Sequence, residues 1–136
     1  MKLSDEERSN IIQVRLEDAR NVFADAQLLL EHGSLRSAAN RVYYAMFYAI
    51  SALTIFKGRT FSKHTGVISY FQKEFVKTKI FSRDHGRAIQ KAFEDRSEAD
   101  YRDYLKITSE DIQQRIKEAD ALINAISDYV KRGRGK

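Results

Sequence analysis

The sequence contains no cysteine, no proline and only six glycines among its 136 residues. Without cysteine the chain has no disulfide framework, no thiol nucleophile and no cysteine-based zinc site. The absence of cysteine is compatible with a reducing cytoplasm, and also with other compartments. Because the residues that most often interrupt helices and form turns are scarce, the composition favours long uninterrupted helices.

Long hydrophobic runs are also absent. The longest apolar segment extends from Val42 to Phe56, VYYAMFYAISALTIF, and contains three tyrosines and a serine. A membrane-spanning helix needs about 20 predominantly apolar residues, so we interpret this run as a buried central helix. The first ten residues are polar and acidic, which argues against a signal peptide. We therefore expect a cytoplasmic protein that does not associate with a membrane.

The excess positive charge is concentrated at one end of the chain. The formal net charge is +5, and residues 131–136 carry four positive charges and no negative one, which leaves +1 for the rest. Such a tail can contact phosphates nonspecifically, or it can be a solvated end that aids solubility. We assign residues 1–130 to a single domain and residues 131–136 to a basic flexible tail.

Apolar residues recur at steps of three and four along most of the chain, which predicts helices. Capping-box patterns at Ser4 and Thr108 predict the starts of the first and last helices. The helix expected over residues 34–57 is apolar on nearly all sides, as is typical of a central helix. Further helices are expected over residues 4–33, over 65–77, and from 82 to a point between 95 and 104. This pattern predicts an all-α, up-and-down antiparallel bundle of four to five helices.

Motifs for metal and phosphate-loop chemistry are missing. None of the three histidines has a glutamate three residues before it, and no pair of histidines has metal-binding helical spacing. No glycine-rich phosphate loop is present. We expect neither a metal site nor a cofactor. A Ser-His-Asp triad stays open, since geometry rather than sequence order defines it, but no positive feature supports one.

The first polar patch interrupts the central apolar helix. It consists of Asn40 and Arg41 followed by tyrosines, of which Tyr44 and Tyr48 share a helix face. One interpretation is structural: Arg41 pairs with an acidic residue of a neighbouring helix, and the tyrosine hydroxyl groups lie at the rim of the bundle. The other interpretation is a binding patch.

The second patch is the stretch FEDRSEADYRDY, residues 93–104. If it is helical, Arg96 and Asp100 are neighbours one turn apart, as are Tyr101 and Tyr104. The structural interpretation is a surface ion pair worth about 0–1 kcal/mol beside tyrosines that cover the end of the bundle. The functional interpretation is that these residues meet to bind or act on a ligand.

Together the two patches resemble a known family. The segments AANRVYYAMFYAISAL, SKHTGV and FEDRSEADY, followed by a capped last helix, resemble the HEPN superfamily over residues 10–130. They are most similar to its small stand-alone prokaryotic branch, which has an Arg-x-x-x-Asp-Tyr motif. The resemblance implies a homodimer of four- to five-helix bundles. It also implies a toxin or defence ribonuclease, often encoded beside a nucleotidyltransferase antitoxin.

The sequence departs from the ribonuclease pattern at one position. Ribonuclease members have an arginine followed four to six residues later by a histidine, whereas Arg96 is followed by Tyr101. Histidine titrates near pH 6.5 and tyrosine near pH 10, so tyrosine is the poorer general base at neutral pH. Tyr101 can still bind a phosphate or stack on a base. Arg59 and His64 match the spacing but lie in a linker, where we expect His64 to cap or position the helix over 65–77.

These observations predict one polar groove, in which Arg96, Asp100 and Tyr101 lie near the first patch. The nucleotide- or RNA-binding residues are expected to be Asn40, Arg41, Tyr44, His64, Arg96 and Tyr104. Three functions stay open. The chain can bind RNA or a nucleotide within a toxin–antitoxin or defence pair, beside a nucleotidyltransferase. It can be a metal-independent ribonuclease that uses Arg96, Asp100 and Tyr101. It can be a structural helical partner or dimerisation module without catalysis.

Overall fold

The structure is a computed structural model that describes residues 3–100 and 107–134, without the side chains of residues 98–100 and 134. Its regular elements are all helical. They are α1 (Asp5–Glu31), α2 (Leu35–Phe56), α3 (His64–Phe71), the π-helical segment η1 (Gln72–Val76), α4 (Arg83–Asp100) and α5 (Ser109–Arg134). The predicted all-α bundle is confirmed.

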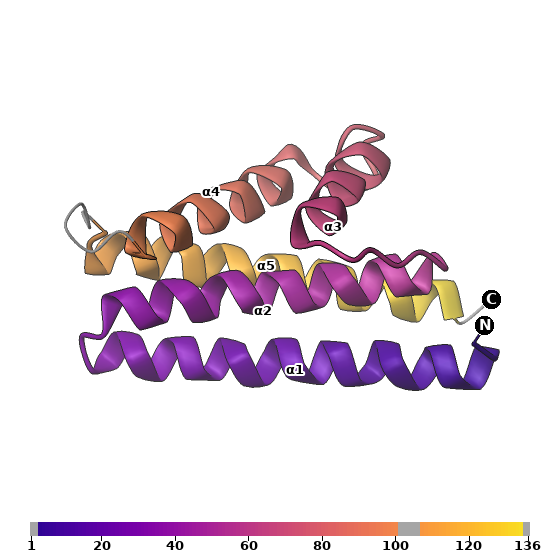
Figure 1. The fold of residues 1–136 in the computed structure, drawn as a ribbon, viewed down its shortest axis with the longest axis horizontal. Helices are drawn as coiled ribbons and strands as arrows, with labels where there is room; N and C mark the ends of the chain where they lie inside the picture. Colours follow the sequence, from indigo (N-terminus) through magenta and orange to yellow (C-terminus); the bar gives the residue numbers. More distant parts are fainter. Residues whose placement is uncertain (1–2, 101–106, 135–136) are drawn as a thin grey trace.

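Helix α2 forms the centre of the bundle. The three long helices α1, α2 and α5 lie side by side, and α3 and α4 cover them from one side (Figure 1). Helix α2 packs against α1, α3, α4 and α5, and twelve of its 22 residues are buried. Fully buried alanines such as Ala45, Ala49 and Ala52 let these neighbours approach closely. The predicted central helix is therefore confirmed.

The helix ends follow the local sequence signals. Ser4 and Glu7 form a capping box at the start of α1. Thr108 and Asp111 exchange two hydrogen bonds of 3.0 and 3.1 Å between backbone N–H groups and side-chain oxygens at the start of α5. The exchange with Thr108 lowers the pKa of Asp111. Gly33, at φ 75°, adopts the left-handed conformation that glycine tolerates best after a helix.

The helix expected over residues 65–77 is present, but the structure differs in detail from the sequence predictions at three places. That helix is α3 followed by the π-helical segment η1, which Gln72 ties to α4 by donating a 2.9 Å hydrogen bond to the carbonyl oxygen of Gly86. His64 begins α3, but no side chain caps that helix. Helix α5 continues to Arg134, so the first four residues assigned to the basic tail are helical.

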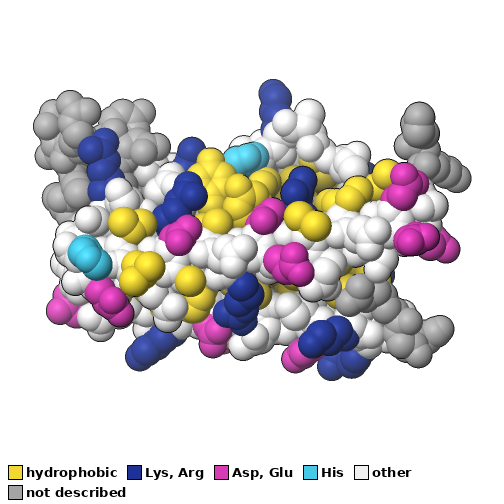
Figure 2. Space-filling model, turned by 90° about the horizontal axis from the view of Figure 1, so that it is seen from below, with side chains coloured by type: hydrophobic (Ala, Val, Ile, Leu, Met, Phe, Trp, Pro, Cys, Tyr) yellow, Lys and Arg dark blue, Asp and Glu magenta, His cyan; other side chains and the backbone are white. Residues whose placement is uncertain are grey.

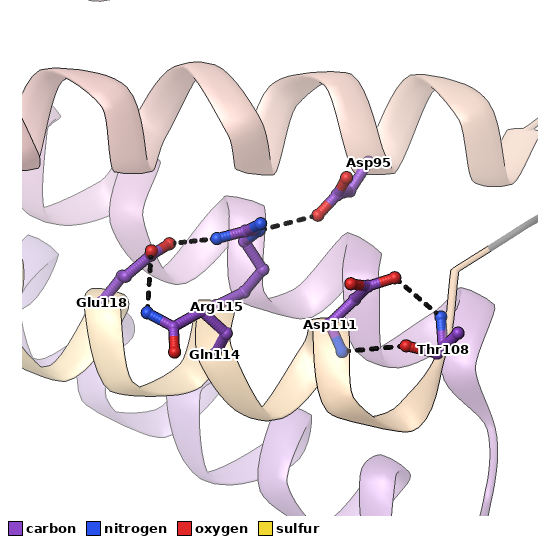
Figure 3. Close-up of polar contacts among 6 residues, drawn as sticks. All are labelled: Asp95, Thr108, Asp111, Gln114, Arg115 and Glu118. Atoms are coloured by element: carbon purple, nitrogen blue, oxygen red, sulfur yellow. Dashed lines mark hydrogen bonds and ion pairs between the residues drawn. The ribbon is translucent and has the colours of Figure 1, made fainter.

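A polar clamp fixes α4 against α5. Arg115 of α5 donates hydrogen bonds to Asp95 of α4, at 2.9 Å, and to Glu118 (Figure 3). The side chains of Arg115 and Asp95 are only 12% and 16% exposed. Burial alone lowers the pKa of Arg115, but its bonds to Glu118 and Asp95 outweigh burial and raise that pKa. Since successive helical residues point about 100° apart, holding Asp95 toward α5 directs Arg96 elsewhere, toward α2.

None of the described helices is both long enough and apolar enough to span a membrane.

Candidate functional site

Arg96 lies against the tyrosines of α2. Its guanidinium carbon Cζ is 5.2 Å from the ring centroid of Tyr43 and 5.4 Å from that of Tyr44. The Cζ atom of Arg41 is 5.3 Å from the same Tyr44 centroid. The two guanidinium groups are therefore less than 11 Å apart. We call Arg41, Tyr43, Tyr44 and Arg96 the arginine–tyrosine cluster.

Neither arginine of the cluster is neutralised by a described carboxylate. Arg41 donates from Nε, at 3.0 Å, and from a terminal nitrogen to the side-chain oxygen of its neighbour Asn40. The Arg41 ion pair with a neighbouring helix, one of the two interpretations of the sequence, is not found among the described residues. The cluster therefore holds two positive charges close together.

Arg96 has a further unsatisfied group. Its Nε atom is buried and has no hydrogen-bond partner among the described residues. A buried donor without an acceptor costs about 1–3 kcal/mol, so an acceptor that reached this atom would remove that cost. Guanidinium groups with free donors are well suited to phosphate and carboxylate ligands.

Aromatic rings extend the cluster toward α3. The His64 ring centroid is 4.1 Å from that of Phe47 and 5.7 Å from that of Tyr44, and Tyr48 lies 6.0 Å from Tyr44. His64 thus positions the start of α3 by ring packing instead of capping it. His64 is exposed and Tyr44 and Tyr48 are partly buried, so these rings can stack on a nucleobase.

Tyr43 is the fully buried member of the cluster, and Arg96 lies over its ring. Burial raises its pKa to about 12; the positive charge of Arg96 lowers that pKa and the neighbouring Tyr44 raises it. Its hydroxyl group lies 3.5 Å from Nδ1 of His64. Tyr43 therefore stays protonated at neutral pH and cannot act there as a general base. The predicted site residues did not include Tyr43, although it belongs to the first polar patch, next to Tyr44.

The raised pKa of Tyr43 predicts a loss of stability at alkaline pH. The folded-state value of about 12 lies above the ordinary value of 10.0, so the full stability is present below pH 10 and is lost as the pH rises toward 12. Between pH 9 and pH 11 the wild type should lose about 1 kcal/mol more unfolding free energy than Tyr43→Phe. Urea unfolding at both pH values measures this difference, and equal losses would contradict a buried, neutral Tyr43.

The predicted site residues divide into two groups. Asn40, Arg41, Tyr44 and Arg96 lie together, and the ring of His64 is next to them. The side chain of Asp100, and Tyr101 and Tyr104 entirely, lie outside the described residues. The linker arginine, Arg59, lies over the rings of Phe61 and Tyr70.

The surface around the helices has mixed charge. Figure 2 shows acidic and basic side chains interspersed over one face, with a patch of hydrophobic side chains beside histidine and basic side chains. In the described part of the chain, no group of three or more histidine, cysteine or acidic side chains could hold a metal ion. The described side chains of the arginine–tyrosine cluster and its surroundings offer guanidinium groups, phenol rings and the imidazole of His64.

A family model, HEPN domain, matches residues 12–129. The chain belongs to the HEPN family. This HEPN protein is 38% identical over 125 residues to a "UPF0332 protein" of Thermotoga maritima, a match that covers 92% of this chain and 95% of the relative. It is 34% identical over 120 residues to the "Putative toxin MJ0605" of Methanocaldococcus jannaschii, covering 88% and 89% of the two chains.

Another relative from the same archaeon, named "Putative toxin MJ0142", is 32% identical to the HEPN protein over 93 residues. That match covers 68% of this chain and 63% of the relative. The family model spans the helices that carry Arg41, Tyr44 and Arg96, so the candidate site lies wholly within the HEPN domain.

Proposed function

We propose that this HEPN protein binds single-stranded RNA, or a nucleotide, through the arginine–tyrosine cluster. The observation that carries the proposal is that Arg41 and Arg96 both lie within 5.4 Å of the Tyr44 ring centroid without a described carboxylate partner. Two close, unneutralised guanidinium groups favour an anionic ligand. The aromatic surface beside them favours one that also carries a base.

The cluster can bind both parts of a nucleotide. The planar fork of a guanidinium group matches two phosphate oxygens, and a phosphate at Arg96 would give the buried Nε donor an acceptor. Stacking of Arg96 on Tyr43 and Tyr44 holds the guanidinium group in place before the ligand arrives. The partly buried ring of Tyr48, 6.0 Å from that of Tyr44, then offers a face to the base.

The biological setting that we propose is a toxin–antitoxin or defence pair. Two relatives of this chain carry names that describe them as toxins. A homodimer and a nucleotidyltransferase antitoxin are the partners that we predict from the family resemblance. Co-purification from the native host would test the second partner directly.

A second candidate is a metal-independent ribonuclease. One observation favours it: the ring of His64 lies 5.7 Å from Tyr44, the same ring that Arg96 covers. An imidazole, the usual acid–base group for such cleavage, thus reaches the cluster although no histidine closely follows Arg96. Cleavage in the presence of EDTA, lost in Arg96→Ala and His64→Ala, would support this activity. Loss in Tyr101→Phe would support the set of Arg96, Asp100 and Tyr101 instead.

The binding proposal is tested by the salt dependence of RNA affinity. Fluorescence anisotropy should show that Arg96→Ala weakens binding of a single-stranded oligonucleotide about tenfold, the value of one charge-assisted hydrogen bond. The slope of log affinity against log salt concentration should fall by about 0.7 for each phosphate that the variant no longer binds.

The matched control is Arg87→Ala. Arg87 lies on α4 as well, and its side chain is 70% exposed and 3.9 Å from Asp84. The variant Arg87→Ala removes the same charge as Arg96→Ala, at a position nine residues from Arg96 and on the opposite face of α4. Equal weakening by Arg87→Ala and Arg96→Ala would show that net charge, and not the cluster, binds RNA.

A further inference from the structure

An open hollow adjoins the cluster beyond its aromatic rings. It has a volume of about 530 Å³ and lies between α1, α2 and the segment that precedes α3. This volume falls within the range of small-ligand sites. Its wall includes Arg15, Asp18, Tyr48, Ser51, Lys63 and His64.

The hollow and the arginine–tyrosine cluster share a wall. Phe47, Tyr48 and His64 line the hollow. The same three rings have centroids between 5.7 and 6.3 Å from that of Tyr44. A chain of nucleotides that leaves the cluster along this strip of rings therefore enters the hollow.

The charge of the hollow suits a phosphate. Lys63 and Arg15 contribute two positive charges, and Asp18, 3.8 Å from Arg15, contributes one negative charge. Lys63 precedes the first turn of α3, which contains no acidic residue and has no side-chain cap. The positive end of the α3 dipole is thus not offset locally and adds to the charge of Lys63.

We propose that the hollow is a second nucleotide subsite for single-stranded RNA, next to the one at the arginine–tyrosine cluster. Lys63 and the first turn of α3 bind the phosphate, and Tyr48 and His64 contact the base. Ser51 and Asp18 offer a hydroxyl group and a carboxylate to the ribose or to the polar edge of the base. This inference rests on the proposed function and extends it to a longer RNA.

Anisotropy titrations with labelled oligouridylates of two and six nucleotides test the subsite. The dinucleotide reports the cluster alone, whereas the hexanucleotide spans both subsites. Lys63→Ala should weaken the hexanucleotide about tenfold and the dinucleotide less than about twofold. Ser51→Phe, which fills the hollow without changing charge, should give the same pattern. Lys73→Ala, an exposed lysine of η1 outside the hollow, is the control.

The outcomes separate this inference from the proposed function. If Arg96→Ala weakens both oligonucleotides but Lys63→Ala and Ser51→Phe bind the hexanucleotide like the wild type, the subsite is overturned and the proposed function stands. If Lys63→Ala weakens uridine monophosphate or the dinucleotide as much as the hexanucleotide, the hollow is an independent nucleotide site and the RNA path is overturned. If the wild type binds neither oligonucleotide, both proposals fail.

Discussion

Replacing Arg41 and Arg96 together by alanine is expected to lower RNA affinity by at least about 100-fold, since each charge-assisted hydrogen bond contributes roughly 1.5–3 kcal/mol. The same double variant should keep the unfolding free energy within about 1 kcal/mol of the wild type. Removal of the cation–π interactions with Tyr43 and Tyr44 destabilises it. Removing two mutually repelling charges and the unpaired Nε of Arg96 offsets that effect.

Anisotropy and urea unfolding on the same samples measure the two effects. The double variant Lys73→Ala/Arg87→Ala removes two exposed charges elsewhere and is the control for net charge. A large loss of stability with unchanged RNA affinity would contradict the binding site. It would favour instead the third function left open by the sequence, a structural or dimerisation module.

Truncation of two adjacent tyrosines should affect stability and RNA binding to different extents. Tyr43→Ala is expected to lower the unfolding free energy by about 3–5 kcal/mol, the usual cost of removing a large buried aromatic side chain. Its ring is fully buried and packs against Phe47 and Phe93. Tyr44→Ala should cost about 1–2 kcal/mol, because its ring is only partly buried. Tyr44→Ala should nevertheless weaken RNA binding by roughly tenfold, since it removes the ring that holds both Arg41 and Arg96 in place.

Thermal unfolding and anisotropy distinguish the two roles. The conservative variants Tyr43→Phe and Tyr44→Phe keep the rings, so both should bind RNA almost as well as the wild type. If Tyr44→Ala loses stability as strongly as Tyr43→Ala and binds RNA normally, Tyr44 belongs to the core and not to the binding surface.

The fold was predictable because its signals are local. Capping boxes at Ser4 and Thr108 and the left-handed position at Gly33 mark helix ends within a few residues of sequence. The nearly all-apolar surface of α2 required a central place, whatever packed around it. The π-helical segment after Phe71 was not predictable from local signals. Its first residue, Gln72, donates a hydrogen bond to Gly86 of α4, a contact between two separate helices.

The sequence pointed to several residues of the arginine–tyrosine cluster but not to their arrangement. The pairing of Arg41 and Arg96 around Tyr44 depends on how α4 crosses α2, and only the family resemblance suggested that arrangement. Residue type alone favoured an acidic partner for Arg41, whereas its described bonds go to Asn40. A helix that is apolar on all sides also gives no periodic signal to separate buried Tyr43 from partly buried Tyr44.

The most direct test of the account is a map of photo-crosslinks between the wild-type protein and a single-stranded RNA that contains 4-thiouridine. Mass spectrometry of the crosslinked peptides identifies the residues that touch the bases. We predict crosslinks at Tyr44, with Tyr48 or His64 as the neighbouring positions, and their loss in Arg96→Ala. Crosslinks confined to helix faces away from these rings, and unchanged in Arg96→Ala, would contradict RNA binding at the arginine–tyrosine cluster.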